Sequence, residues 1–549
     1  MAGFRATGST LADPMATTPS TQAPAGAGSP SDEASRRRTF AIISHPDAGK
    51  TTLTEKILLY AGAVVEAGQV KARRRRREVV SDWMALERER GISVTSTALR
   101  FEVLGTKFNL LDTPGHRDFS EDTFRVLAAA DSAVMLLDAA KGIEERTLKL
   151  FQVARERRIP LITFVNKLDR PSLEPLALTD EIERELGLRA TPVTWPVGSA
   201  ERFRGVIDRR QATLHKFTRT PGGSKLAEEE RVELADVSDR DGDWGAAEEE
   251  LALLDAVGAD LSMLDYMAGE ATPVFFGSAL SNFGVRLLLE ALVELAPSPQ
   301  PRALSDGGSR PLDAPFSAQV FKLQANLDPR HRDRLAFVRI CSGRFERGMK
   351  AVNSRTGDAI TMSYAHELFG QDRVTIEEAF PGDVVGLVSG GDVRVGDTLY
   401  QSEPASFPTF RILAPERFVA ARNRDTSRYK QFRRGLEQLE QEGVVHVLHR
   451  PEVGPQSPIL AGIGPMQFEV AAYRMEREFG AEVEMEPLKW PLSRRIEAVD
   501  AEAVRAWTRG EVLMDGAGTH LAVFRSEFEL ERFARDHPEV ALDPFIAGG

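Results

Sequence analysis

The sequence is poor in the features that mark secreted, membrane-bound and nucleic-acid-coating proteins. Its 549 residues include one cysteine, Cys341, which excludes an internal disulfide framework and is typical of a reducing compartment. No apolar run approaches the roughly 18 residues that a membrane-spanning helix needs. The net charge of −12 excludes binding of nucleic acid by bulk electrostatics, although it leaves room for local basic contacts with RNA. We therefore expect a cytoplasmic protein without a membrane segment.

Apolar residues are also scarce at the N-terminus. The first 38 residues end in three arginines and are otherwise mostly Ala, Gly, Pro, Ser and Thr, with no stretch long enough for the core of a signal peptide. Such a segment cannot bury enough surface to order itself, so residues 1–38 are predicted to form a disordered extension, with order beginning at Thr39. The remaining length suggests about three or four domains.

A phosphate-binding loop is predicted immediately after the first apolar run. Residues 40–43 are typical of a buried strand, and residues 53–58 have helical spacing. Between them stands the sequence Ser44-His45-Pro46-Asp47-Ala48-Gly49-Lys50-Thr51. Here Lys50 would reach the β and γ phosphates of a nucleotide, and the Thr51 hydroxyl would bind Mg²⁺. Ser44 stands where the strict pattern has glycine, and Gly-Lys-Thr alone is also compatible with an ordinary strand-to-helix turn.

Two further strands end in residues that suit the same site. Residues 108–111 lead into Asp112-Thr113-Pro114-Gly115-His116, where Asp112 is placed to hold Mg²⁺ and Gly115 can point its N–H group at a γ-phosphate. Residues 161–165 lead into Asn166-Lys167-Leu168-Asp169. The Asp169 carboxylate can accept hydrogen bonds from N1–H and the 2-amino group of guanine, and adenine has neither donor on that edge. The predicted nucleotide is therefore GTP or GDP.

The segment between these motifs gives the chain a family resemblance. Asp82-Trp83-Met84 and the following residues 87–93 resemble the first switch of translational GTPases of the elongation factor G group. The resemblance implies that Ser93, where the family has threonine, completes the Mg²⁺ shell. It also implies that His116 is the catalytic residue that orients the attacking water. An inserted subdomain is expected at about residues 190–270, after which Ser278 and Ala279 would contact guanine O6.

Within that group the chain looks most like the class II peptide chain release factors, on four segments at residues 44–47, 118–123, 191–196 and 324–329. The chain also ends at Gly549, without room for the last domain pair of a translocase. The resemblance implies a monomeric, ribosome-dependent GTPase that stimulates release of class I release factors after termination. Its implied partners are ribosomal RNA and stalk proteins. Residues 73–77 are five arginines, which are either a solvated loop or an RNA contact.

The expected fold class is multidomain. An α/β P-loop GTPase domain is predicted at residues 39–296, followed by a linker at 297–313. Short β-rich runs separated by glycines predict an antiparallel β-barrel domain at 314–403. Alternating strands and helical stripes, such as Phe432, Leu436 and Leu439, predict an α/β sandwich at 407–549.

Two other functions stay open on the sequence alone. One is another ribosome-acting GTPase, such as a protection or rescue factor. The other is a GTP-dependent adaptor that hardly hydrolyses its nucleotide. Factor-dissociation kinetics would separate the first from a release factor, and multiple-turnover phosphate release would identify the second.

Overall fold

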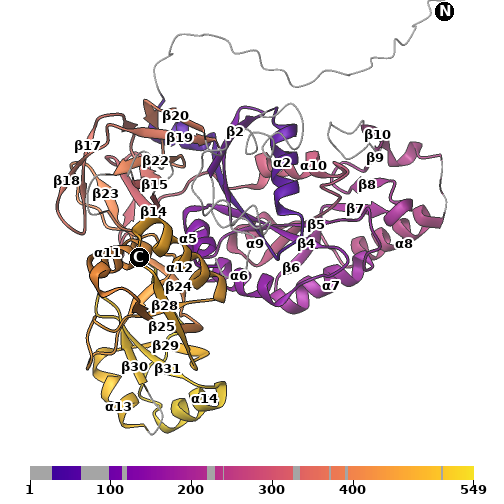
Figure 1. Cartoon of the computed structure of the whole chain (residues 1–549). Coiled ribbons are helices and arrows are strands. Elements are labelled where there is room, and N and C mark those ends of the chain that lie inside the picture. Colours follow the sequence, from indigo (N-terminus) through magenta and orange to yellow (C-terminus); the bar gives the residue numbers. More distant parts are fainter. Residues whose placement is uncertain are drawn as a thin grey trace, which may run out of the picture.

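The structure is a computed structural model that describes residues 28–62, 98–113, 120–218, 229–238, 240, 242–325, 334–369, 372–389, 393–507 and 511–548. It contains a GTPase domain, a β-barrel domain and an α/β C-terminal domain, which confirms the predicted fold class (Figure 1). Over these residues, no helix is long and apolar enough to cross a membrane.

The GTPase domain is built on a seven-stranded sheet in the order β2-β3-β1-β4-β5-β11-β6. All neighbouring strands are parallel except β2 and β3. Apolar residues run through the central strands because helices cover both faces, and β4 is buried along its whole length. The strands are β1 (Arg37–Ser44), β2 (Ala98–Val103), β3 (Thr106–Asp112), β4 (Ser132–Asp138), β5 (Leu161–Asn166), β6 (Arg189–Pro192) and β11 (Ala271–Phe276).

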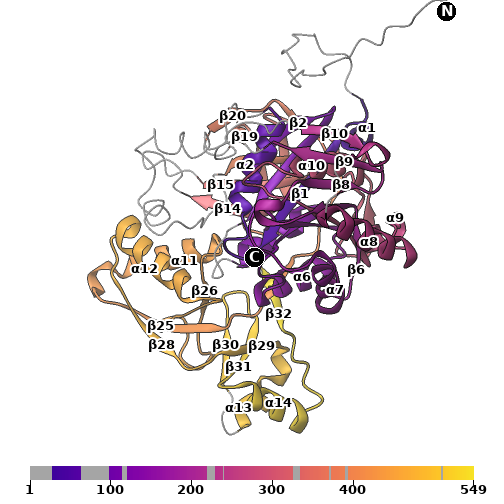
Figure 2. The ribbon, with the colours of Figure 1, turned by 90° about the vertical axis from the view of Figure 1, so that its right-hand side faces the viewer.

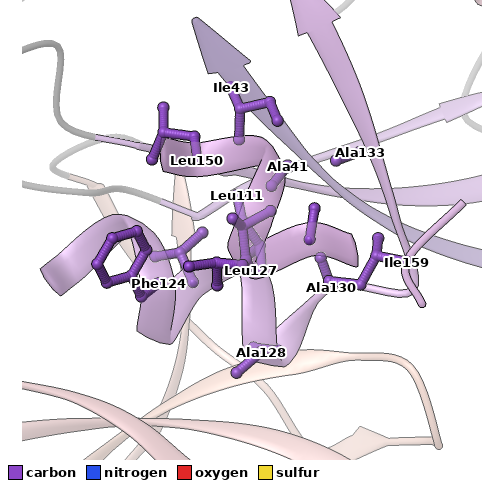
Figure 3. Packing of buried hydrophobic residues seen from close by; sticks show 14 of the residues in the cluster. Ala41, Ile43, Leu111, Phe124, Leu127, Ala128, Ala130, Ala133, Leu150 and Ile159 are labelled. Atoms are coloured by element: carbon purple, nitrogen blue, oxygen red, sulfur yellow. The ribbon is translucent and has the colours of Figure 1, made fainter. Parts of the chain in front are cut away.

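The two faces of this sheet have separate cores. Phe40 and Ile42 of β1 pack with α2 (Lys50–Tyr60) and α10 (Val285–Leu295) on one face. Ala41 and Ile43 point to the other face, among α5 (Ser120–Ala129) and α6 (Glu145–Glu156), as Figure 3 shows. The helix α7 (Pro175–Leu186) lies beyond α6. This alternation follows from the two-residue period of a strand.

The inserted subdomain lies between β6 and β11. Because β6 belongs to the main sheet, the insertion begins after Pro192, slightly later than the expected residue 190. Its four-stranded antiparallel sheet comprises β7 (Thr194–Val197), β8 (Gly205–Asp208), β9 (Thr213–Phe217) and β10 (Glu229–Glu233). Its helices are α8 (Gly242–Ala256) and α9 (Met263–Ala268).

The barrel domain has eight antiparallel strands in the order β18-β17-β23-β14-β15-β22-β19-β20. They are β14 (Ser317–Ala325), β15 (Arg334–Ser342), β17 (Lys350–Asn353), β18 (Ala359–Thr361), β19 (Ala365–Phe369), β20 (Asp372–Thr375), β22 (Val384–Ser389) and β23 (Thr398–Tyr400). A two-stranded ladder joins β16 (Phe345–Glu346) to β21 (Glu378–Ala379). The expected linker at 297–313 also contains a short ladder, β12 (Arg302–Ala303) with β13 (Ser309–Arg310), because Gly307 turns the chain with a φ of +86°.

The C-terminal domain consists of two α/β layers in succession. In the first, α11 (Tyr429–Gln441) and α12 (Pro465–Phe479) cover the sheet β26-β27-β25-β28, and the predicted stripe of Phe432, Leu436 and Leu439 is buried there. In the second, α13 (Ala501–Ala506) and α14 (Glu527–Asp536) cover β29-β31-β30, at the end farthest from the seven-stranded sheet (Figure 2). The strands are β24 (Phe410–Leu413), β25 (Arg417–Asn423), β26 (His446–Leu448), β27 (Ile459–Gly462), β28 (Val483–Leu488), β29 (Leu492–Ile496), β30 (Glu511–Met514), β31 (His520–Phe524) and β32 (Phe545–Gly548), the last of which pairs with β24.

The prediction that disorder extends to residue 38 is wrong. Residues 30–35 form the helix α1 (Pro30–Ser35), whose first turn is capped by Ser29, and β1 already begins at Arg37. Arg37 is only 2% exposed, and its Nε donates to Asp383 Oδ2 of the barrel domain at 2.8 Å. Residues 1–27 of the predicted extension lie outside the described residues. Ordered structure therefore begins nearer the N-terminus than composition indicates, because Asp383 of the barrel domain supplies an ion-pair partner for Arg37.

The same junction is organised around one backbone carbonyl. Gly382 O accepts hydrogen bonds from Thr39 Oγ1 at 2.7 Å, from Asn109 Nδ2 at 3.0 Å and from Arg339 Nη1 at 2.8 Å. Thr39 and Asn109 belong to the GTPase sheet, whereas Arg339 belongs to the barrel. A side chain at Gly382 would meet Pro299 Cγ at 2.5 Å, and its φ of +103° favours glycine as well. The two domains are therefore joined by buried, directional bonds.

We predict that Asp383→Asn lowers the free energy of unfolding by about 2 kcal/mol, because the buried Arg37 guanidinium loses its charged partner across the junction while keeping its ion pair with Glu33 of α1. Urea denaturation followed by circular dichroism measures the effect. The matched control is Asp358→Asn, which removes an exposed carboxylate of the same domain and should change stability by less than about 0.5 kcal/mol. Equal midpoints for the two variants would contradict the prediction.

Candidate nucleotide-binding site

The predicted nucleotide-binding motifs meet at one edge of the GTPase sheet. Ser44, Asp112 and Asn166 are the last residues of β1, β3 and β5, and Ser278 follows the end of β11. Because these strands are parallel, their carboxyl ends lie together, which is where open α/β sheets bind ligands. The first, second and third motifs therefore form one site.

The loop between β1 and α2 is shaped by Gly49 and braced by Asn166. Gly49 has a φ of +101°, and a Cβ atom there would meet Asn166 Nδ2 at 2.5 Å. That nitrogen donates to Ala48 O at 2.7 Å. Asp47 also has a positive φ, of 65°, so the loop turns back sharply before α2. The N-terminus of α2 then presents unpaired backbone N–H groups of the kind that bind phosphate.

Lys50 and Asp112 face each other across the phosphate end of the site. The Lys50 ammonium donates to Asp112 Oδ1 at 2.5 Å and to the carbonyl of Thr113. The Thr113 hydroxyl in turn donates to Ile42 O at 2.8 Å and holds this turn against β1. Thr51 is exposed at the start of α2.

The oxygen atoms of Thr51 and Asp112 fit Mg²⁺, since hydroxyl and carboxylate oxygens are the hard ligands that this ion prefers. In the described part of the chain, no group of three or more His, Cys, Asp or Glu side chains could hold a metal ion. The protein atoms would thus need phosphate oxygens and water to complete the shell, as expected where a metal ion binds together with its nucleotide.

The base end of the site is a network between the loops after β5 and β11. Asn166 Oδ1 accepts from the backbone N–H of Ala279 at 2.8 Å, and Asp169 Oδ1 accepts from Ser278 Oγ at 2.5 Å. Leu168 N also donates to Gly277 O at 3.2 Å. The carboxylate of Asp169 is half-buried, and the Ser278 hydroxyl holds one of its two oxygens.

Two further acidic residues contact predicted site residues, and the sequence analysis did not identify them. Lys167, which has a φ of +74°, donates through Nζ to Asp138 Oδ2 at 2.8 Å. Burial by itself would raise the pKa of Asp138, but the bond from Lys167 and a backbone N–H hold this pKa below its usual value. Asp138 ends the apolar strand β4 as Asp112 ends β3, and this repeated pattern could have revealed it.

The second missed residue is Glu144, just before α6. Its Oε2 atom lies 2.6 Å from Nδ1 of the buried His45 in the phosphate loop. Burial lowers the pKa of His45, while Glu144 opposes that effect. No local sequence pattern points to this contact. Four other predicted site residues, Ser93, Pro114, Gly115 and His116, lie outside the described residues.

The helix α5 follows the second motif in sequence and contacts both other domains. Its Asp122 Oδ2 lies 3.2 Å from Lys322 Nζ of the barrel domain. Its buried Glu121 Oε1 lies 2.9 Å from His446 Nε2 of the C-terminal domain. A Cβ atom at Gly443 would overlap the guanidinium of Arg125, so glycine is needed for this close approach. Any displacement of α5 would therefore change contacts with two domains.

His446 is the titratable member of this contact. Burial and Arg125 lower its pKa, but Glu121, helped by Glu440, raises the pKa above the usual histidine value. Because the pKa is raised in the folded state, the stabilisation is complete below the unfolded pKa of about 6.5 and is lost as pH rises through the folded pKa.

Three family models match successive parts of the chain. Their descriptions are Elongation factor Tu GTP binding domain over residues 35–298, Elongation factor G domain 2 over residues 315–402, and Class II release factor RF3, C-terminal domain, over residues 406–534.

Curated relatives match across almost the whole chain. Peptide chain release factor 3 of Microcystis aeruginosa is 48% identical over 94% of this chain and 96% of its own length. The protein of the same name from Gloeobacter violaceus is 48% identical over 92% of this chain and 97% of its own length. A crystal structure of a protein from Thermus thermophilus resembles the fold with a TM-score of 0.65, at 24% identity, over 84% of this chain and 68% of that chain.

We predict that Asp169→Asn shifts the nucleotide preference from GTP toward xanthosine triphosphate by a factor on the order of 10² or more, because the amide N–H₂ can donate to the 2-oxo group of xanthine. Competition binding of labelled nucleotides to the free protein measures the shift. Asp180→Asn, which changes an exposed residue of α7, is the matched control and should keep the wild-type preference. An unchanged preference in Asp169→Asn would show that the base binds elsewhere.

We further predict that His446→Gln destabilises the protein more at pH 6 than at pH 9, because only the protonated imidazole pairs with the Glu121 carboxylate. Urea midpoints of both proteins at the two pH values test this. His520→Gln, in the outer layer of the C-terminal domain, serves as the control for general effects of losing a histidine. A difference between wild type and His446→Gln that is independent of pH would mean that the contact is not ionic.

Proposed function

Because the chain belongs to the peptide chain release factor 3 family of translational GTPases, we propose that it uses GTP hydrolysis to promote the departure of class I release factors from the ribosome after termination. The observation that carries this proposal is the C-terminal domain, whose match is specific to class II release factors. The GTPase and barrel domains alone would fit other translational GTPases as well. We expect a monomer that acts in the cytoplasm.

In the proposed mechanism, the protein binds and orients GTP at the edge of the seven-stranded sheet. Lys50 and the N-terminus of α2 receive the phosphates, while Asp169 receives N1–H and the 2-amino group of guanine. The loop pair braced by Asn166 keeps these two ends at a fixed separation. Thr51, Ser93 and, through water, Asp112 would hold Mg²⁺, which supplies neutralisation of charge on the β and γ phosphates.

The chain's own contribution to hydrolysis is positioning. Phosphoryl transfer depends on alignment and charge neutralisation more than on a strong base. We assign His116 the role of orienting the attacking water, with the Gly115 N–H directed at the γ-phosphate. Both residues come shortly before α5 in the sequence. Loss of the γ-phosphate would therefore alter the segment that leads into α5, and with it the position of the helix. The contacts of α5 with Lys322 and His446 would then carry the change to the other two domains.

This arrangement gives the two nucleotide states different domain contacts. A ribosome that binds one domain arrangement better than the other shifts the equilibrium of the protein toward that arrangement. Hydrolysis of GTP then shifts the equilibrium toward the other arrangement. We propose that the GTP state binds ribosomal RNA and stalk proteins and favours a ribosome from which the class I factor departs. GDP would then release the protein itself.

The decisive experiment follows a labelled class I release factor on ribosomes stalled at a stop codon. Adding this protein with GTP should accelerate dissociation of the label, and omitting either should not. Asp169→Asn provides an internal control, because it should be active with xanthosine triphosphate and inactive with GTP. If dissociation is not accelerated, the chain acts as another ribosome-bound GTPase, such as a protection or rescue factor. Multiple-turnover phosphate release in the same reactions would identify an adaptor that hardly hydrolyses GTP.

We predict that His116→Ala keeps GTP binding within about twofold but loses most ribosome-stimulated hydrolysis, by about 10²-fold or more, because water positioning matters in the transition state and little in the ground state. Phosphate release with saturating ribosomes gives the rate, and nucleotide binding to the free protein gives the affinity. The control is His537→Ala on the C-terminal surface. Stimulated hydrolysis at the wild-type rate would assign the catalytic role to another residue.

A further inference from the structure

Positive charge is concentrated on the outer side of α11. Lys430, Arg433 and Arg434 are exposed there, and Tyr429 is 43% exposed beside them. We call these four residues the α11 cationic face. The protein as a whole carries a net charge of −12, so this local excess of positive charge is opposite in sign to the rest of the molecule.

The cations of this face have no ion-pair partner among the described residues, where Lys430, Arg433 and Arg434 form no salt bridge. Glu437, which is also exposed, lies one helical turn beyond Arg433 and Arg434 without pairing with either. Nearby cations on β25 and the following turn do have partners: Arg422 lies 3.5 Å from Glu486, and Arg424 lies 3.6 Å from Glu482. The exposed guanidinium and ammonium groups of α11 are therefore available to an external anion.

Their position is also unfavourable for the helix itself. Lys430 and Arg434 are one helical turn apart, where like charges repel. Lys430 lies in the first turn of α11, where the helix dipole disfavours positive charge, and that turn has no acidic residue to offset it. Sequences accept such local costs mainly where a function requires them.

The inner side of α11 explains why the cations are not needed for folding. Phe432, Leu436 and Leu439 pack into the core under the helix. Gly435 allows close contact with α12, since a Cβ atom there would meet Met475 Sδ at 2.4 Å. The fold thus depends on the apolar side of α11 and holds the cationic face outward on a fixed support.

We propose that the α11 cationic face binds the phosphate backbone of RNA, which on the proposed function is ribosomal RNA. Exposed lysine and arginine side chains on one helix can contact neighbouring phosphates, and the exposed tyrosine beside them can stack on an unpaired base. The face lies on the element that leads, past Gly443, to His446 and its contact with Glu121 of α5. RNA bound to α11 would therefore restrain the stretch of chain that ends at His446. His446 contacts α5, the helix that follows the predicted second nucleotide-binding motif.

The first test is a salt series of ribosome binding for the variant K430Q/R433Q/R434Q, with a non-hydrolysable GTP analogue. Each lost phosphate contact reduces the steepness of log affinity against log salt by about 0.7–0.9, so the loss of three should reduce it by about 2.1–2.7. Affinity at low salt should fall by at least 10-fold. We expect the variant to keep the free-protein GTP affinity of the wild type, because all three side chains are exposed. Its thermal midpoint should equal or slightly exceed that of the wild type, because the change removes charges that repel one another on α11.

The matched control is R184Q/R202Q/R532Q, which makes the same change in net charge. Its arginines are exposed but already paired, with Glu185 at 3.0 Å, Asp243 at 3.0 Å and Asp536 at 3.7 Å. It should keep the wild-type slope within experimental error. Parallel slopes for the two triple variants would overturn the proposal.

A photocrosslinking amino acid in place of Tyr429 identifies the partner. Crosslinks that ribonuclease removes would support RNA, whereas crosslinks to a ribosomal protein, or none above those from the same amino acid in place of the exposed Phe528, would overturn the proposal. These outcomes are independent of the proposed function, which fails if wild-type protein binds ribosomes but does not accelerate departure of the class I factor.

Discussion

The buried junction between the GTPase and barrel domains is the constraint on which the rest of the arrangement depends. One carbonyl, Gly382 O, accepts from Thr39, Asn109 and Arg339, and the neighbouring Asp383 pairs with Arg37. A carbonyl has two lone pairs, so three donors from two domains leave it little freedom. Because buried charges are costly to separate, opening this junction would cost more than breaking an exposed ion pair.

The helix α5 connects the GTPase domain to both other domains. It meets the C-terminal domain through Glu121 and His446, and it meets the barrel through Asp122 and Lys322. Asp131, just beyond α5, accepts from the same Arg339 that donates to Gly382 O, so the helix ends beside the junction. The side chains in these contacts are largely buried, since Glu121 is 2%, Lys322 5% and His446 16% exposed. They are also adjacent in sequence to the predicted second nucleotide-binding motif. A change at the nucleotide would reach the C-terminal domain through contacts of this kind.

The α11 cationic face lies in the part of the C-terminal domain that leads to the contact with α5. Its helix is held by an apolar stripe on one side and carries exposed cations on the other. The chain then passes Gly443, which packs on Arg125, and reaches His446. A surface for the proposed RNA contact and a contact with α5 thus belong to one short stretch of chain. The net negative charge of the rest of the protein would keep nonspecific RNA binding low.

Local patterns in the sequence predicted the three motifs that meet at the sheet edge, the three-domain division and the apolar stripe of α11. Strand, loop and helix signals lie within a few residues of one another, so no distant partner is needed to predict them. Only the tertiary structure decided the order of residues 30–38, the pairing of Glu144 with His45 and the contact of His446 with Glu121. Arg37 and Asp383, for example, are 346 residues apart in sequence. Such contacts leave no periodicity, because they depend on how separately folded domains pack together.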